Sequence, residues 1–168
     1  MSEIETFRER LSFDAEAGEI RDGEVRYLLI RPDTLMGAFA LLPAALRDQA
    51  LDALARATTE HGAKSARRYQ AMGAGEAQEL LATIAATAPE LGWGLWTRHA
   101  RADGALDLEV RNSPFAAGFG ASDGPVCAAI AGMLAAVAGL VAGREMAARE
   151  VACAAAGAAS CRFEARAK

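Results

Sequence analysis

The sequence predicts an α+β domain with a mainly antiparallel sheet and helices packed on one face of that sheet. Three observations predict it. Strand-like segments bracket a long helical stretch without regular strand–helix alternation, two Asp-Gly pairs lie between strand-like runs, and an alanine-rich helix precedes the last strands. No internal repeat or linker divides the chain, so residues 1–168 are expected to form a single domain.

Residues 11–30 predict a hairpin, because Asp22-Gly23 is a two-residue turn signal between two strand-like runs. Pro32 is expected to end the second strand, and Asp33 is a candidate cap for the helix that follows.

The pattern remains helical to about residue 88, with breaks expected at Pro43 and across residues 73–75. A second hairpin is expected over residues 93–111. Its turn is placed at Asp103-Gly104, and apolar and charged residues alternate along its second strand.

Residues 112–124 are expected to form a loop, and a helix rich in alanine is expected to open at Asp123-Gly124-Pro125. The terminal segment predicts two further strands, over about 144–152 and 161–166.

The uncharged run 125–143 is long enough to be a candidate for a membrane span. Its content is mostly alanine and glycine, and its larger side chains recur every three or four residues on one stripe. That spacing favours a buried helix packed on two sides, so no membrane span is predicted. The stripe consists of Val126, Ile130, Leu134, Val137 and Val141.

The charge balance excludes some partners. Eighteen basic and 22 acidic residues give a net charge of −4, which argues against nucleic acid and against docking on anionic lipid. Residues 1–10 are polar rather than the apolar core of a signal peptide, and the three cysteines are an odd number. A cytoplasmic location is therefore expected.

All three cysteines fall close together near the C-terminus and can meet with one carboxylate. Cys127 is placed in the first turn of the alanine-rich helix, while Cys153 and Cys161 flank the last turn, where they can come close together. Glu150 joins them only if a bulge or bend interrupts its strand. Three thiolates and a carboxylate would form a closed, four-coordinate site for a structural Zn²⁺ ion. The alternative is that the cysteines are small buried apolar residues.

The motif Glu150-x2-Cys153-x3-Gly157-x3-Cys161-x-Phe163 resembles the C-terminal signature of the 4-vinyl reductase, or hydrocarbon-binding, domain family. The run 11–20 and the run 26–30 are similar to the sensory domain of aromatic-responsive transcription activators. The resemblance implies the fold of ligand-binding domains in nitric-oxide signalling and in the tethering subunits of Golgi transport. It also implies that Cys127, Glu150, Cys153 and Cys161 bind a structural zinc ion.

The resemblance further implies a pocket for a small hydrophobic ligand between sheet and helices. Aromatic residues that line this pocket in phenol-sensing relatives correspond here to Val110, Ala131 and Ala148. These smaller residues argue against phenol and leave either a roomier cavity or one closed by other packing. The candidate ligand-binding residues are Trp96, Val110, Phe115, Phe119, Ala131 and Ala148.

The leading hypothesis is a zinc-stabilised domain that binds a hydrophobic or aromatic ligand as a sensor or carrier. One alternative is an accessory factor or enzyme of bacteriochlorophyll synthesis that acts on a vinyl tetrapyrrole. Another is a structural dimerisation module, since relatives often form homodimers and small residues of the alanine-rich helix could contact a second subunit. Gly118-x-Gly120-x3-Gly124 is not a dinucleotide fingerprint, and no site for a hydride donor is seen, so the sequence does not favour catalysis.

Overall fold

The computed structural model describes residues 5–101 and 105–168, and it confirms the predicted α+β class. The turn expected at Asp103-Gly104 lies outside the described residues. The helices are α1 (Phe7–Arg10), α2 (Pro32–Ala40), α3 (Ala44–Ala71), α4 (Ala77–Glu90), α5 (Pro114–Phe119), α6 (Ala128–Ala142) and a 3₁₀ turn η1 (Ala154–Ala156). The strands are β1 (Ser12–Asp14), β2 (Glu19–Asp22), β3 (Val25–Tyr27), β4 (Leu95–Ala100), β5 (Leu106–Arg111), β6 (Met146–Ala152) and β7 (Cys161–Ala167).

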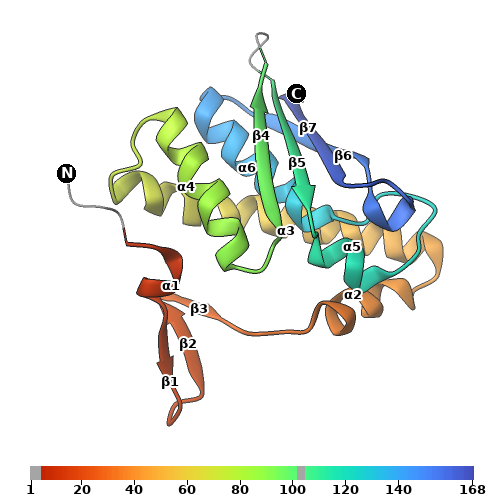
Figure 1. Cartoon of the computed structure of the whole chain (residues 1–168), viewed down its shortest axis with the longest axis horizontal. Helices are drawn as coiled ribbons and strands as arrows, with labels where there is room; N and C mark the ends of the chain where they lie inside the picture. The colour runs from red at the N-terminus through yellow and green to blue at the C-terminus, as the bar shows by residue number, and fades with distance from the viewer. Residues whose placement is uncertain (1–4, 102–104) are drawn as a thin grey trace.

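The strands form two antiparallel sheets. The main sheet has the order β4-β5-β7-β6, and helices α3, α4 and α6 lie behind it in Figure 1. Residues 5–27, which contain α1 and the small sheet β1-β2-β3, form an N-terminal unit that projects from the body. An extended strap, residues 28–31, connects this unit to α2.

The first predicted hairpin is present and has an additional strand. Its turn at Asp22-Gly23 is observed, and Gly23 adopts the positive φ that this turn requires. The strand expected to run to residue 30 ends at Tyr27, because the strap leaves the small sheet. Pro32 occupies the first turn of α2, where its missing N–H costs nothing, and Arg31 rather than Asp33 is the capping residue.

The region 112–124 is not entirely a loop, because it contains α5. Ser113 caps this helix by accepting a hydrogen bond from the Ala116 amide, and Pro114 begins it. The alanine-rich helix begins later than expected, at Ala128, so Asp123-Gly124-Pro125 precedes it rather than capping it.

Helix α6 is packed on two sides, as its pattern predicts. Ile130, Leu134 and Val137 are buried in the core shared with the sheet. Gly132 faces α3, where a Cβ atom would lie 2.3 Å from the carbonyl oxygen of Ala55. Part of the small-residue surface expected to meet a second subunit is therefore occupied by α3 of the same chain. None of the helices in the two described ranges is both long and apolar enough to cross a bilayer.

Candidate metal centre and ligand cavity

A β-bulge brings the acidic and sulfur side chains at the end of β6 together. In a regular strand, Glu150 and Cys153 would point to opposite faces of the sheet. The register of β6 against β7 shifts between Glu150 and Ala152, so Val151 is an extra residue in the ladder. This insertion restores a common side for Glu150 and Cys153, as the sequence interpretation required.

The other two residues come from separate elements. Cys127 is the N-cap residue of α6, and Cys161 is the first residue of β7. Beyond Cys153, the chain turns through η1 and reverses at Gly157, which has a φ of 89°. A side chain is strained in that left-handed conformation, so glycine suits this turn.

The four side chains lie close enough to hold a metal ion. One ligand atom from each of Cys127, Glu150, Cys153 and Cys161 lies within 4.8 Å of the others. The sulfur of Cys127 is 3.6 Å from that of Cys161 and 4.0 Å from that of Cys153. A tetrahedron with metal–sulfur bonds of about 2.3 Å has edges of about 3.8 Å, so the observed separations match it closely. The three thiols are free rather than joined as disulfides.

The hydrogen bonds around the cluster leave room for one more positive partner. Oε2 of Glu150 accepts a 2.8 Å hydrogen bond from the Cys127 amide, whereas its buried Oε1 has no hydrogen-bond partner within the described part of the chain. Unpaired buried oxygens are uncommon and often mark an ion that completes the site. Ser113 Oγ lies 3.2 Å from the Cys127 sulfur, and the Ala154 amide donates to the Cys161 sulfur.

The electrostatics of the cluster point the same way. Burial, the largest effect, raises the pKa of Glu150 to about 7, because the charged carboxylate loses its hydration. Hydrogen bonds from Cys127 and then Cys161 lower the pKa of Cys153 well below its usual range, because they stabilise its thiolate. A thiolate beside a buried carboxylate is a strong site for a cation. With four protein ligands, no coordination position remains for an activated water.

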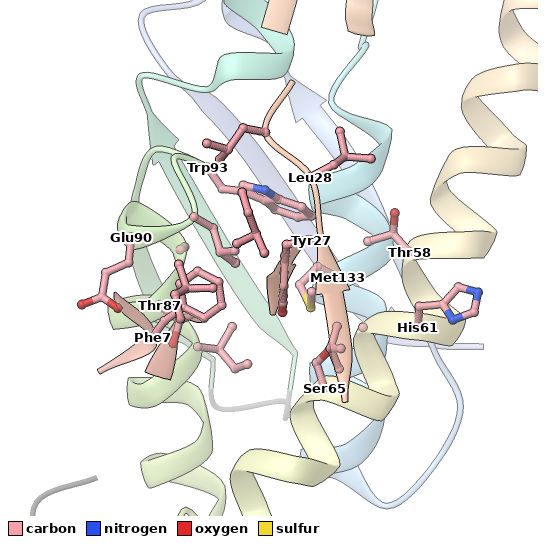
Figure 2. A pocket seen from close by; sticks show the side chains of 18 of the residues that line it. Phe7, Tyr27, Leu28, Thr58, His61, Ser65, Thr87, Glu90, Trp93 and Met133 are labelled. Atoms are coloured by element: carbon pink, nitrogen blue, oxygen red, sulfur yellow. The ribbon is translucent and has the colours of Figure 1, made fainter. Parts of the chain in front are cut away.

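A separate cavity of about 560 Å³ lies between the N-terminal unit with its strap and the body of the protein. Figure 2 shows side chains from the N-terminal unit, from α3 and from α4 converging on it. Most of its lining is apolar, with Phe7, Tyr27 and Leu28 on one side and Trp93 and Met133 on others. Cavities of this size and character are typical of small-molecule sites.

Some of the predicted ligand-binding residues line this cavity and others do not. Trp96 and Phe115 line it, and Phe115 packs edge-on against Trp93, also a lining residue, with ring centroids 5.1 Å apart. The remaining four are not among its lining residues in the part of the chain that the structure describes. They are Val110, Phe119, Ala131 and Ala148.

These four positions have other surroundings. Val110 is fully buried between Trp96 and Cys161 on the neighbouring strands. Phe119 is buried, with the guanidinium of Arg47 5.8 Å from its ring centre. Ala131 and Ala148 are half-buried and pack against the core.

Sequence reasoning missed the contribution of the N-terminal unit and of α3. The run Leu28-Leu29-Ile30 supplies part of the wall although these side chains are largely exposed. Three consecutive large apolar residues before a helix were the available signal. His61, expected to be solvated, is exposed and lies on the lining, whereas His99 lies on the opposite, solvent-facing side of the main sheet.

The arrangement of elements is that of a ligand-sensing domain. The structure is similar to the crystal structure of the phenol-responsive sensory domain of the transcription activator PoxR with phenol. The TM-score is 0.78 at 22% identity, and the match covers 93% of this chain and 84% of that one. It is also similar to a vinyl-4-reductase family protein from Methanocaldococcus jannaschii, with a TM-score of 0.51, 16% identity, and coverage of 86% and 84%. No curated protein matches the sequence.

Residues 106–167 match the family model of the 4-vinyl reductase domain, which confirms the family predicted from the cysteine motif. The matched segment includes all four residues of the candidate metal centre. It also includes Phe115 of the cavity, whereas the lining contributed by the N-terminal unit and α3 lies outside it.

Proposed function

We propose that this protein is a zinc-stabilised sensor or carrier domain that binds a hydrophobic molecule larger than phenol in the cavity beside α3 and α4. The observation that carries this proposal is the cavity itself, with a volume of about 560 Å³ and a mostly apolar lining. An apolar cavity of about 150 Å³ is enough for benzene. A single phenol ring would therefore fill only a fraction of the space.

Zinc is the metal that the donor set favours. Thiolate ligands select zinc over magnesium or calcium, which prefer oxygen ligands. Three sulfur atoms and one carboxylate complete a tetrahedral shell without water, which suits a structural role. The ion would join the start of α6, through Cys127, to the end of β6 and the start of β7.

The metal centre and the cavity share a wall. Cys161 pairs with Val110 across the sheet, and Val110 pairs with Trp96, which lines the cavity. On the helical side, Ser113 contacts the Cys127 sulfur and caps α5, the helix that carries Phe115. A metal bound at the cluster would therefore hold Trp96 and Phe115 in position for a ligand.

A sensory role is supported by the similarity of the fold to a domain described as phenol-responsive, and a carrier would use the same cavity. A vinyl tetrapyrrole, the alternative ligand raised by the sequence, is one large apolar candidate for it. A homodimer and a cytoplasmic location remain predictions.

Native mass spectrometry of the protein purified from its own host tests the proposal. We expect one zinc ion per chain and a bound apolar molecule that organic solvent removes. The same spectrum counts the chains in the assembly, and its ligand mass distinguishes a tetrapyrrole from a smaller hydrocarbon. Protein that carries no metal and fails to take up any apolar compound would contradict the proposed function.

A further inference from the structure

One end of the cavity is polar, where the N-terminal unit meets α3. Tyr27 and Tyr69 both line the cavity there. The carboxylate of Asp22, which is only 4% exposed, pairs with Arg10 at 3.2 Å and with Arg68 at 3.1 Å. Two guanidinium groups share one carboxylate, so this cluster carries a net positive charge next to the two tyrosines.

Tyr69 has a proton to donate. Its hydroxyl accepts a 3.2 Å hydrogen bond from Arg10, whose guanidinium also lies 5.2 Å from the centre of the tyrosine ring. A phenolic hydroxyl can accept and donate at once. The acceptor capacity of Tyr69 is used by Arg10, and none of the described residues accepts its proton. The residue is 6% exposed, so bulk water has little access to it.

Tyr27 is the second available donor. Figure 2 shows its ring standing in the cavity, with Phe7 and Thr87 on one side and Ser65 on the other. Its hydroxyl has no hydrogen-bond partner in residues 5–101 and 105–168. Burial, followed by the nearby Tyr69 and Asp22, raises the pKa of Tyr27 to about 12, so the hydroxyl remains protonated at neutral pH.

We propose that the ligand of this cavity is an apolar molecule with a carbonyl or carboxylate oxygen at one end, and that Tyr27 and Tyr69 each donate a hydrogen bond to that oxygen. This inference rests on the proposed function, because it requires the cavity to bind a ligand. The positive cluster behind Tyr69 favours an oxygen that carries negative charge. The rest of the lining selects for size and hydrophobicity, so the two hydroxyls would determine chemical specificity.

Two probes of matched shape test the proposal. 2-Acetylnaphthalene carries a carbonyl oxygen, and 2-ethylnaphthalene replaces that carbonyl with a methylene group. Their dissociation constants are measured by equilibrium dialysis for the wild type, Tyr27→Phe, Tyr69→Phe and Thr87→Val. The last variant is the control, because the Thr87 hydroxyl already donates to the carbonyl of Thr83.

Each tyrosine variant is expected to weaken binding of the ketone by about five- to tenfold, the effect of one lost hydrogen bond. Binding of the hydrocarbon should change by less than about twofold, since the side chains keep their apolar surface. This unchanged affinity also shows that each variant is folded. Thr87→Val should not discriminate between the two probes.

Equal weakening of both probes, or no weakening of either, would show that the tyrosines only pack in the cavity and would overturn the inference. A selective loss in only one variant would overturn the arrangement with two donors. Failure of the wild type to bind either naphthalene would instead count against the proposed function.

Discussion

Substitution of Gly132 by alanine tests how closely α6 and α3 must approach to form the cavity wall. Gly132 lies in the middle of α6, and a Cβ atom there would be 2.3 Å from the backbone oxygen of Ala55. The same atom would be 3.0 Å from the Cβ atom of Thr58, a residue of the cavity lining. A backbone carbonyl cannot rotate away as a side chain can, so the two helices must separate.

Two opposing terms set the magnitude. Alanine improves helix propensity over glycine by about 1 kcal/mol. Overpacking a closely packed interface costs about 1–3 kcal/mol, and contact with backbone favours the upper end. We therefore expect Gly132→Ala to lower the free energy of unfolding by about 1–2 kcal/mol. For a chain of this size, each kcal/mol lowers the melting temperature by about 2–4 °C.

Gly139→Ala is the matched control on the same helix. Its nearest neighbour outside the helix backbone would be the Arg144 oxygen at 3.4 Å, an ordinary contact. This variant should be as stable as the wild type or more stable by up to about 1 kcal/mol. Urea denaturation followed by circular dichroism measures all three proteins. If Gly132→Ala proves as stable as Gly139→Ala, the close approach of the helices is wrong.

Three further predictions concern the metal, the cavity and the N-terminal unit. Cys153→Ser should reduce the zinc content measured by elemental analysis from about one per chain to near zero and lower the melting temperature; unchanged values would leave the cysteines as packing residues only. The chain has two tryptophans, Trp93 and Trp96, and both line the cavity, so an apolar ligand should change the intrinsic fluorescence; saturation with ligand without such a change would place the ligand elsewhere. Asp22→Asn removes the charge that pairs with Arg10 and Arg68, so hydrogen exchange in β1–β3 should accelerate, whereas unchanged exchange would show that these ion pairs do not hold the unit.

Much of the fold is encoded in local signals that the sequence makes visible. Asp22-Gly23 produces a hairpin turn wherever two strand-like runs flank it, and Pro43 interrupts a helix regardless of the rest of the chain. The metal-site residues were predictable from residue type and spacing, together with the resemblance to a known family. The β-bulge after Glu150 could be inferred because the cluster required it.

The cavity could not be predicted in the same way, because it depends on contacts between distant segments. Its wall needs Tyr27 and Leu28 placed against α3 and Trp93, and no local pattern specifies that packing. Positions assigned by correspondence, such as Val110, are filled by neighbouring side chains instead. Helix α5 was missed because the glycines and Asn112 around it suggested a loop, although Ser113 and Pro114 form a helix start.

X-ray absorption at the zinc edge of the purified protein tests the central claim most directly, because it counts the atoms bound to the ion. Coordination by Cys127, Cys153, Cys161 and Glu150 predicts three sulfur ligands at about 2.3 Å and one oxygen ligand at about 2.0–2.2 Å. A spectrum with only nitrogen and oxygen ligands, or protein without zinc, would contradict it.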